Sequence, residues 1–131
     1  NVISVKGKDW REDLNKVLEA SRQHTAETGQ PNLSIVGVDT LTALYSEKRC
    51  EEILNLSATD ARRAGAPVIA IVKAGLRELA VRLSPIADIY LRLTMKHGCP
   101  LLYGIKPRTC LYAVEIDVSK GYPQPKLTPI L

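Results

Sequence analysis

Two short apolar segments constrain the fold of this chain more than any other feature of its sequence. They are residues 33–38 (LSIVGV) and 67–72 (PVIAIV). A run of consecutive apolar residues places apolar side chains on both faces of a strand, which is typical of a parallel strand covered on both faces of its sheet. Parallel neighbours cannot be joined by a tight turn and need a crossover, usually a helix. The sequence therefore predicts an α/β fold.

Capping residues mark two helices around these segments. Asp9 is a candidate N-cap, and Glu12 three residues later completes a capping box, while Gly29 is placed to end the helix. Ser46 is a candidate N-cap for a second helix, which Gly65 is placed to end. The second helix would connect the two apolar strands.

The remaining segments complete the order of predicted elements. A short strand over residues 2–5 precedes the first helix, and a short helix over residues 76–83 stops at Pro85. Beyond Pro85 the period changes to two, which indicates half-buried strands. We expect a single three-layer α/β domain over residues 1–131, with parallel strands extended at one edge by an antiparallel meander. The strands of the meander are expected at residues 86–93, 101–106 and 110–118. An extended tail over residues 121–131 follows them.

Composition excludes several classes of protein. The 131 residues suit one domain, and no apolar run approaches the roughly 18 residues that span a bilayer. Three widely spaced cysteines and two histidines do not make a zinc site. Unpaired cysteines and the lack of a signal-peptide pattern predict a cytoplasmic protein.

Asp39 and Thr40 directly follow the first apolar strand, at its carboxyl end. Ligands of open α/β sheets bind at this edge. A carboxylate held there can bind Mg²⁺ beside a phosphate, as in a Walker B element. The alternative is that Asp39 caps the following turn or helix.

The sequence Lys106-Pro107-Arg108-Thr109 places two cations in a predicted hairpin turn. Lys106 and Arg108 are candidate catalytic residues, because cations on a stiff turn can neutralise the charge of a phosphoryl group across a subunit interface. The alternative is an exposed turn whose charges only keep it soluble.

In their order and spacing, these elements resemble the C-terminal half of a RecA-superfamily ATPase domain of the archaeal KaiC and GvpD kind. The resemblance rests on the Walker B-like strand, on residues 86–93 (IADIYLRL) and on residues 102–109 (LYGIKPRT), and it covers roughly residues 33–118. It implies a P-loop NTPase fold in an oligomer that binds Mg²⁺ and ATP. Asp39 would then hold the metal, Asp39 and Thr40 would contact the cofactor, and Lys106 and Arg108 would act on a neighbouring subunit.

One part of the family pattern is missing. The phosphate loop, G-x-x-x-x-G-K-[ST], occurs nowhere in the 131 residues. The chain is therefore either a C-terminal fragment that lacks the loop or a degenerate, non-catalytic regulatory or scaffold module that binds a protein partner. In both cases we expect no ATP hydrolysis and no tight nucleotide binding by this chain alone.

The missing phosphate-loop strand has a mechanical consequence. In the family's sheet it lies between the strands at residues 68–72 and 86–93. Its absence would leave unpaired edges, which invite self-association. Nucleic acid is a less favoured partner, because the net charge of +4 is spread along the chain and no basic stripe interleaved with aromatic residues is present.

Overall fold

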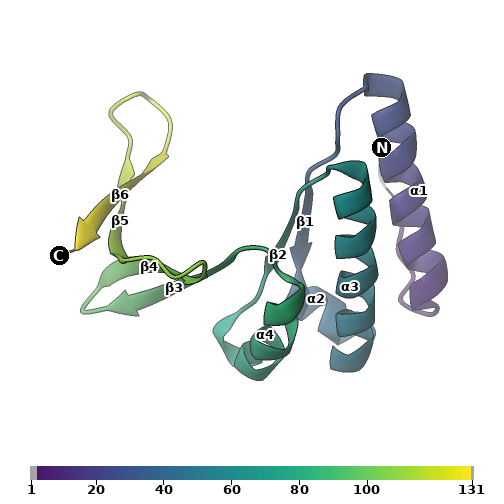
Figure 1. Ribbon diagram of the computed structural model, residues 1–131, viewed down its shortest axis with the longest axis horizontal. Helices are drawn as coiled ribbons and strands as arrows, with labels where there is room; N and C mark the ends of the chain where they lie inside the picture. The colour runs from purple at the N-terminus through teal and green to yellow at the C-terminus, as the bar shows by residue number, and fades with distance from the viewer. Residues whose placement is uncertain (1–2, 131) are drawn as a thin grey trace. The chain divides into compact units, whose positions relative to one another are not determined.

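The computed structural model describes residues 3–130, and their contacts gather in two compact units. The first unit ends at Ile86, and the second begins at Ala87. Figure 1 shows helices and a pair of strands in the first unit and strands alone in the second. The fold is mixed α/β, as the sequence predicts; the prediction of a single domain over residues 1–131 stays a prediction.

The first helix, α1 (Trp10–Thr28), begins and ends where its capping residues predict. The Asp9 carboxylate accepts hydrogen bonds from the backbone N–H groups of Arg11, at 2.9 Å, and of Glu12, at 3.3 Å. Gly29 closes the helix in the left-handed conformation with φ 69°. Local chemistry therefore suffices to set both ends of this helix.

Strands β1 (Ser34–Gly37) and β2 (Val68–Ile71) form a two-stranded parallel sheet. The chain passes from one strand to the other through two helices, α2 (Val38–Leu44) and α3 (Glu47–Ala64). Figure 1 shows α3 beside the strands and α1 beside α3. The parallel pair and its helical crossover are confirmed.

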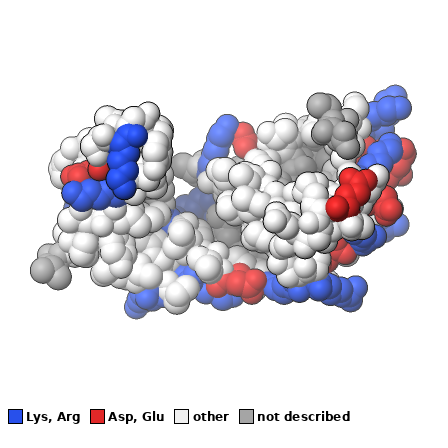
Figure 2. All heavy atoms as spheres, turned by 90° about the horizontal axis from the view of Figure 1, so that it is seen from above, with Lys and Arg blue, Asp and Glu red and all other residues white. Residues whose placement is uncertain are grey.

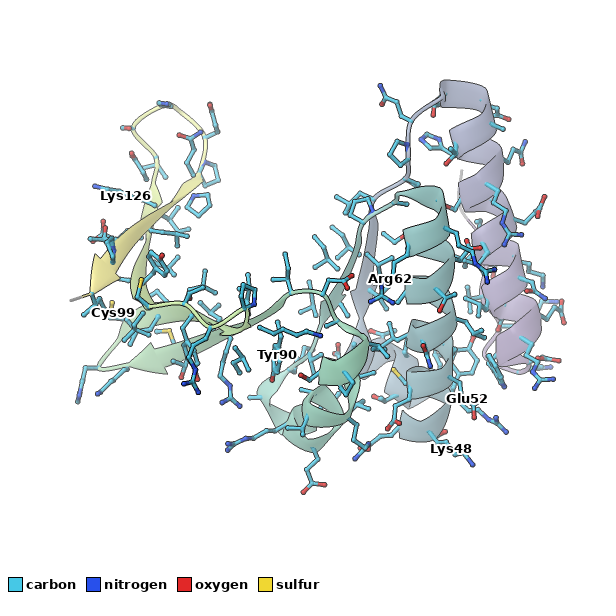
Figure 3. All side chains as sticks on the ribbon, viewed as in Figure 1. Lys48, Glu52, Arg62, Tyr90, Cys99 and Lys126 are labelled. Atoms are coloured by element: carbon cyan, nitrogen blue, oxygen red, sulfur yellow. The ribbon has the colours of Figure 1, made fainter. Side chains whose placement is uncertain are left out.

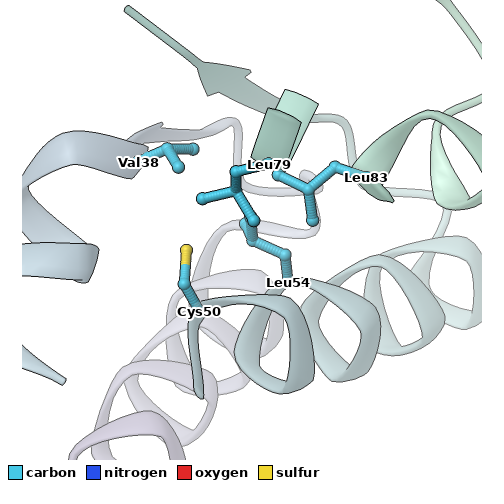
Figure 4. Packing of buried hydrophobic residues seen from close by; sticks show 5 residues of the cluster. All are labelled: Val38, Cys50, Leu54, Leu79 and Leu83. Carbon is cyan, nitrogen blue, oxygen red and sulfur yellow. The ribbon is translucent and has the colours of Figure 1, made fainter. Parts of the chain in front are cut away.

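A short 3₁₀ turn, η1 (Ala74–Leu76), leads into α4 (Arg77–Leu83), which a second 3₁₀ turn, η2 (Ser84–Ile86), follows. Arg82 of α4 contacts carboxylates of two α3 glutamates. Arg62 of α3, labelled in Figure 3, donates to the carbonyl oxygen of Ile86 at 2.6 Å. Polar contacts thus bind the C-terminal part of the α4 region to both ends of α3. Between these helices lies the buried core drawn in Figure 4, which consists of Val38, Cys50, Leu54, Leu79 and Leu83.

The second unit is a four-stranded antiparallel sheet in the order β3-β4-β5-β6. The strands β3 (Tyr90–Lys96) and β4 (Cys99–Lys106) pair antiparallel, with one register shift between Tyr90 and Leu91. The strand β5 (Leu111–Asp117) pairs with β6 (Gln124–Ile130) over seven residues. The predicted antiparallel meander is present, and the predicted extended tail is its last strand.

Three sequence-based expectations differ from the structure. The strand expected over residues 86–93 begins only at Tyr90 and runs to Lys96, because Ile86 still belongs to the 3₁₀ turn η2. The meander does not extend an edge of the parallel sheet, because β2 pairs only with β1 and the strands β3–β6 pair only among themselves. The expected strand over residues 2–5 is also absent from its described part, residues 3–5, while Val2 lies outside the described residues. The next backbone N–H groups, of Lys6 and Gly7, bond to the side chain of Asp13 instead of to a sheet partner.

The parallel sheet leaves apolar side chains open to solvent. Ile35, Ile69 and Ile71 are about half exposed or more, at 63, 48 and 54%. Their odd-numbered positions put them on one face of the sheet, because side chains alternate along a strand. None of the helices among residues 3–130 is long and apolar enough to cross a membrane.

Candidate functional site

Asp39 stands where β1 ends and α2 begins. The residue before it, Val38, is fully buried and fixes this turn in the core. Asp39 is therefore both the residue that follows the strand and an acidic residue in the first turn of a helix, where the helix dipole favours negative charge. The structure places it at the carboxyl edge of the sheet, with Thr40 next to it in the same turn.

Lys73 lies at the same edge. It follows β2 by two residues, and β2 is the neighbour of β1, with Gly37 opposite Ile71 in the register. The ammonium nitrogen of Lys73 is 2.5 Å from Oδ2 of Asp39. The parallel pairing thus brings together two charged side chains that lie 34 positions apart in the sequence.

Sequence reasoning did not single out Lys73, although a signal for it existed. A charged residue close behind an apolar strand is the same pattern that identified Asp39, and Lys73 directly follows the segment 67–72. Once β1 and β2 are predicted to be parallel neighbours, residues that follow both strands are expected at one edge.

The ion pair favours the ionised form of Asp39. The hydrogen bond from Lys73 is the main cause that lowers the pKa of the Asp39 carboxyl below its usual range. The charge of Lys73 and the backbone N–H groups of Asp39 and Thr40 lower this pKa further, while partial burial raises it. The Asp39 side chain is 34% exposed and that of Lys73 is 71% exposed. Both charges are therefore accessible to a ligand from solvent.

The donor set at this edge fits a Mg²⁺ ion that is already bound to phosphate. Mg²⁺ in such sites takes one or two carboxylates, waters and phosphate oxygens. Asp39 supplies one carboxylate, and no group of three or more His, Cys, Asp or Glu side chains able to hold a metal lies among residues 3–130. One carboxylate alone supplies too few ligands for Mg²⁺, which would need waters and phosphate oxygens as well.

The hairpin between β4 and β5 carries the other two predicted site residues. The ammonium group of Lys106 donates to the carbonyl oxygen of Ala87 at 2.6 Å. Arg108 is exposed and makes no hydrogen bond or ion pair with any residue that the structure describes. Lys106 thus has a structural partner here, whereas the guanidinium group of Arg108 is free.

Gly104 fixes the shape of this hairpin. Its N–H donates to the hydroxyl oxygen of Thr109 at 2.8 Å, and its carbonyl oxygen accepts from the N–H of Thr109 at 3.2 Å. A Cβ atom at position 104 would come within 2.4 Å of the carbonyl oxygen of Pro107. Only glycine allows the chain to turn back this closely. Asp39 belongs to the first unit and this hairpin to the second.

A second polar cluster, which sequence reasoning missed, surrounds Asp13. This carboxylate is only 4% exposed and accepts hydrogen bonds from the N–H groups of Lys6 and Gly7 and, at 2.7 Å, from the hydroxyl of Tyr45. The bond from Tyr45 is the largest of the effects that lower the pKa of Asp13, while burial together with Asp13 raises the pKa of Tyr45 to about 12. The cluster joins the segment before α1 to the end of α2, which is a structural role.

Other ionic features of the surface are mixed in sign. Figure 2 shows Lys and Arg side chains interspersed with Asp and Glu on the face that it draws. Several are paired, for example Arg22 with Asp60 at 2.8 Å and Arg49 with Glu52 at 2.6 Å. Of the three cysteines, Cys50 is buried, which raises the pKa of its thiol to about 11, while Cys99 and Cys110 are exposed.

No protein-family model matches this chain, and no curated protein matches it either.

Proposed function

We propose that this chain supplies the metal side of a nucleotide-binding site in a RecA-like, KaiC- or GvpD-like ATPase. The observation that supports this most is the meeting of Asp39 and Lys73 at the carboxyl ends of two adjacent parallel strands. The nucleotide is MgATP. The loop that cradles its phosphates comes from polypeptide outside these 131 residues, because the sequence contains no such loop.

The roles of the residues follow from their chemistry. The Asp39 carboxylate would hold Mg²⁺, and the hydroxyl of Thr40 lies in the same turn. When bound, the ion neutralises phosphate charge and orients the phosphates for attack. Lys73 pairs with the carboxylate in the free protein and turns to a phosphate oxygen when nucleotide binds. Arg108, and Lys106 once released from Ala87, act on nucleotide held by a neighbouring subunit.

A half-site of this kind binds MgATP weakly, with a dissociation constant on the order of 1 mM, since most phosphate contacts are missing. We expect two-dimensional ¹H–¹⁵N NMR spectra to show MgATP-dependent shifts at Gly37, Thr40 and Ala74. The substitutions Asp39→Asn and Lys73→Met should abolish them. No shifts at 10 mM MgATP, or shifts that survive both substitutions, would overturn the proposal.

Asp60→Asn is the matched control. Asp60 is an aspartate of the same unit with an arginine partner, Arg22, instead of a lysine. It lines a separate cleft of about 350 Å³ between α1 and α3, together with the small residues Ser21, Ser57 and Ala61. We expect this variant to retain the shifts. A coupled assay should detect no ATP hydrolysis by any of these proteins.

One observation favours a second candidate, a non-catalytic regulatory or scaffold module that binds a protein partner. Two of the three candidate catalytic residues have partners within the chain, Asp39 through Lys73 and Lys106 through Ala87. In that case these pairs are structural. The nucleotide-site proposal predicts MgATP-dependent shifts in the NMR titration, whereas the scaffold proposal predicts none.

A further inference from the structure

The two edges of the antiparallel sheet differ in a way that bears on association. β6 pairs only with β5, and β3 pairs only with β4, so each has one edge without a partner among the described strands. An unpaired edge offers backbone N–H and C=O groups to any other extended chain unless side chains block it. The residues at these two edges decide which of them is open.

The β6 edge is blocked by proline. Pro125 and Pro129 lie opposite Ile116 and Tyr112 of β5 in the register. Proline is tolerated in a sheet where its missing N–H would face away from the neighbouring strand. The free edge of β6 therefore lacks donors at both positions, and Lys126, labelled in Figure 3, adds a charge between them. This edge cannot accept a regular antiparallel partner.

The β3 edge carries no such block. Its seven residues, Tyr90 to Lys96, include no proline, and they are paired with β4 along their whole length. Leu91, Leu93 and Met95 are 53, 64 and 66% exposed. Their alternate positions make one continuous apolar row, because every second side chain of a strand points to the same face.

The other row of β3 carries two charges, Arg92 and Lys96, and Arg92 is turned inward while Lys96 ends the strand. The guanidinium group of Arg92 lies 3.4 Å from the hydroxyl of Tyr103 on β4, which raises the pKa of the arginine. This contact draws the side chain toward the strand that β3 already pairs with. Arg92 therefore does not hinder the pairing of another strand with the free edge.

We propose that β3 is an interface between two copies of this chain, which pair antiparallel about a two-fold axis at Leu93. This register places Leu93 opposite its own copy and Leu91 of one copy opposite Met95 of the other, so that the two apolar rows form one stripe. On the opposite face Arg92 meets Thr94 and Tyr90 meets Lys96, so no two like charges lie directly opposite each other. A two-fold axis requires such self-complementarity. In the sheet of the family that the chain resembles, the missing phosphate-loop strand would lie at this edge, so the dimer is inferred for these 131 residues by themselves.

The size of the contact sets its strength. The three apolar side chains expose roughly 100 Å² each, so about 600 Å² over two copies is the upper limit of what they can bury, because neighbouring strands contact each other's side chains only along one flank. With the backbone edge and the opposite row, the contact stays below the ~1,000 Å² at which specific interfaces begin. The dimer is therefore weak and depends on concentration. The free edge of β2 is a poorer candidate because it is only four residues long.

Sedimentation velocity between about 5 and 500 μM tests the proposal. We expect the apparent mass to rise from monomer to dimer with concentration. Leu93→Lys, which places two ammonium groups opposite each other, should leave a monomer. Leu127→Lys is the control, because Leu127 is an exposed leucine, at 47%, on the blocked edge; it should retain the dimer. A wild-type monomer at 500 μM, or a dimer that survives Leu93→Lys, would overturn the proposal.

Disulfide trapping tests the register even where a lysine disturbs folding. In a background in which the exposed Cys99 and Cys110 are changed to serine, Leu93→Cys should cross-link two copies on oxidation, since residues directly opposite have Cβ atoms about 5 Å apart. Leu91→Cys alone should not cross-link, whereas Leu91→Cys combined with Met95→Cys should. Equal cross-linking by Leu91→Cys alone and by the double variant would contradict the proposed register.

Discussion

Replacing Leu79 by alanine should strongly destabilise the first unit. Leu79 has no exposed surface and lies in the core formed by α2, α3 and α4, where Cys50 and Leu54 are its neighbours. The substitution removes three carbon atoms, about 2 kcal/mol of transfer free energy, and leaves a cavity that adds roughly 1 kcal/mol. We therefore expect the free energy of unfolding to fall by about 3 kcal/mol.

The melting temperature offers a direct measurement. For a cooperative unit of this size, 1 kcal/mol corresponds to about 4–8 °C, so the expected fall is about 12–24 °C. Val81→Ala is the matched control, because Val81 lies in the same helix and is 62% exposed. It should change the free energy of unfolding by no more than about 0.5 kcal/mol. Equal effects of the two substitutions in calorimetry would refute the packing of α4 on α3.

Two further substitutions probe the hairpin and the Asp13 cluster. Gly104→Ala should lower the free energy of unfolding in urea by about 1–3 kcal/mol, because the new Cβ atom clashes with a backbone carbonyl oxygen. Gly75→Ala is the control and should be nearly neutral, because a Cβ atom at position 75 has no neighbour within 4 Å. Equal effects of the two substitutions would contradict the hairpin geometry. Tyr45→Phe should shift acid unfolding to higher pH. Asp13 has a folded-state pKa below its unfolded value, so its contribution is full above the unfolded pKa and is lost as the pH falls through the folded one. Without the Tyr45 hydroxyl the folded pKa rises, and an unchanged acid midpoint would contradict this role.

Features that depend on neighbouring residues could be predicted from the sequence. Asp9 and Ser46 both accept backbone hydrogen bonds at helix starts, and Gly29 and Gly65 both close helices in the left-handed conformation. The one missing detail is the return bond expected of Glu12, whose carboxylate contacts Lys16 instead. Helix caps depend on a few consecutive residues, so they can be predicted from a single sequence.

Features that depend on distant residues were harder to predict. The apolar segments 33–38 and 67–72 identify both parallel strands, but the contact of Lys73 with Asp39 follows only when the strands are also taken as neighbours, whose following residues meet at one edge. The meander was expected at an edge of the parallel sheet and forms its own sheet instead. Strand pairing is decided by which edges remain free, and the period of a strand carries no information on its partner.

In the candidate site, too, local features could be predicted and contacts between distant residues could not. Asp39 and Thr40 were placed correctly at the carboxyl edge of β1, because a strand end can be recognised locally. The Lys106 contact with Ala87 joins residues far apart in the sequence and was not foreseen. The proposed roles of Asp39, Lys106 and Arg108 stay predictions.

The measurement that tests the central claim most directly is paramagnetic line broadening by MnATP, because Mn²⁺ takes the same oxygen ligands as Mg²⁺. We predict that substoichiometric MnATP broadens the amide signals of Thr40 and Lys73 first, at both strand ends, and that Asp39→Asn removes this broadening. Broadening confined to other surfaces, or unchanged by Asp39→Asn, would contradict a nucleotide-linked metal site at this edge.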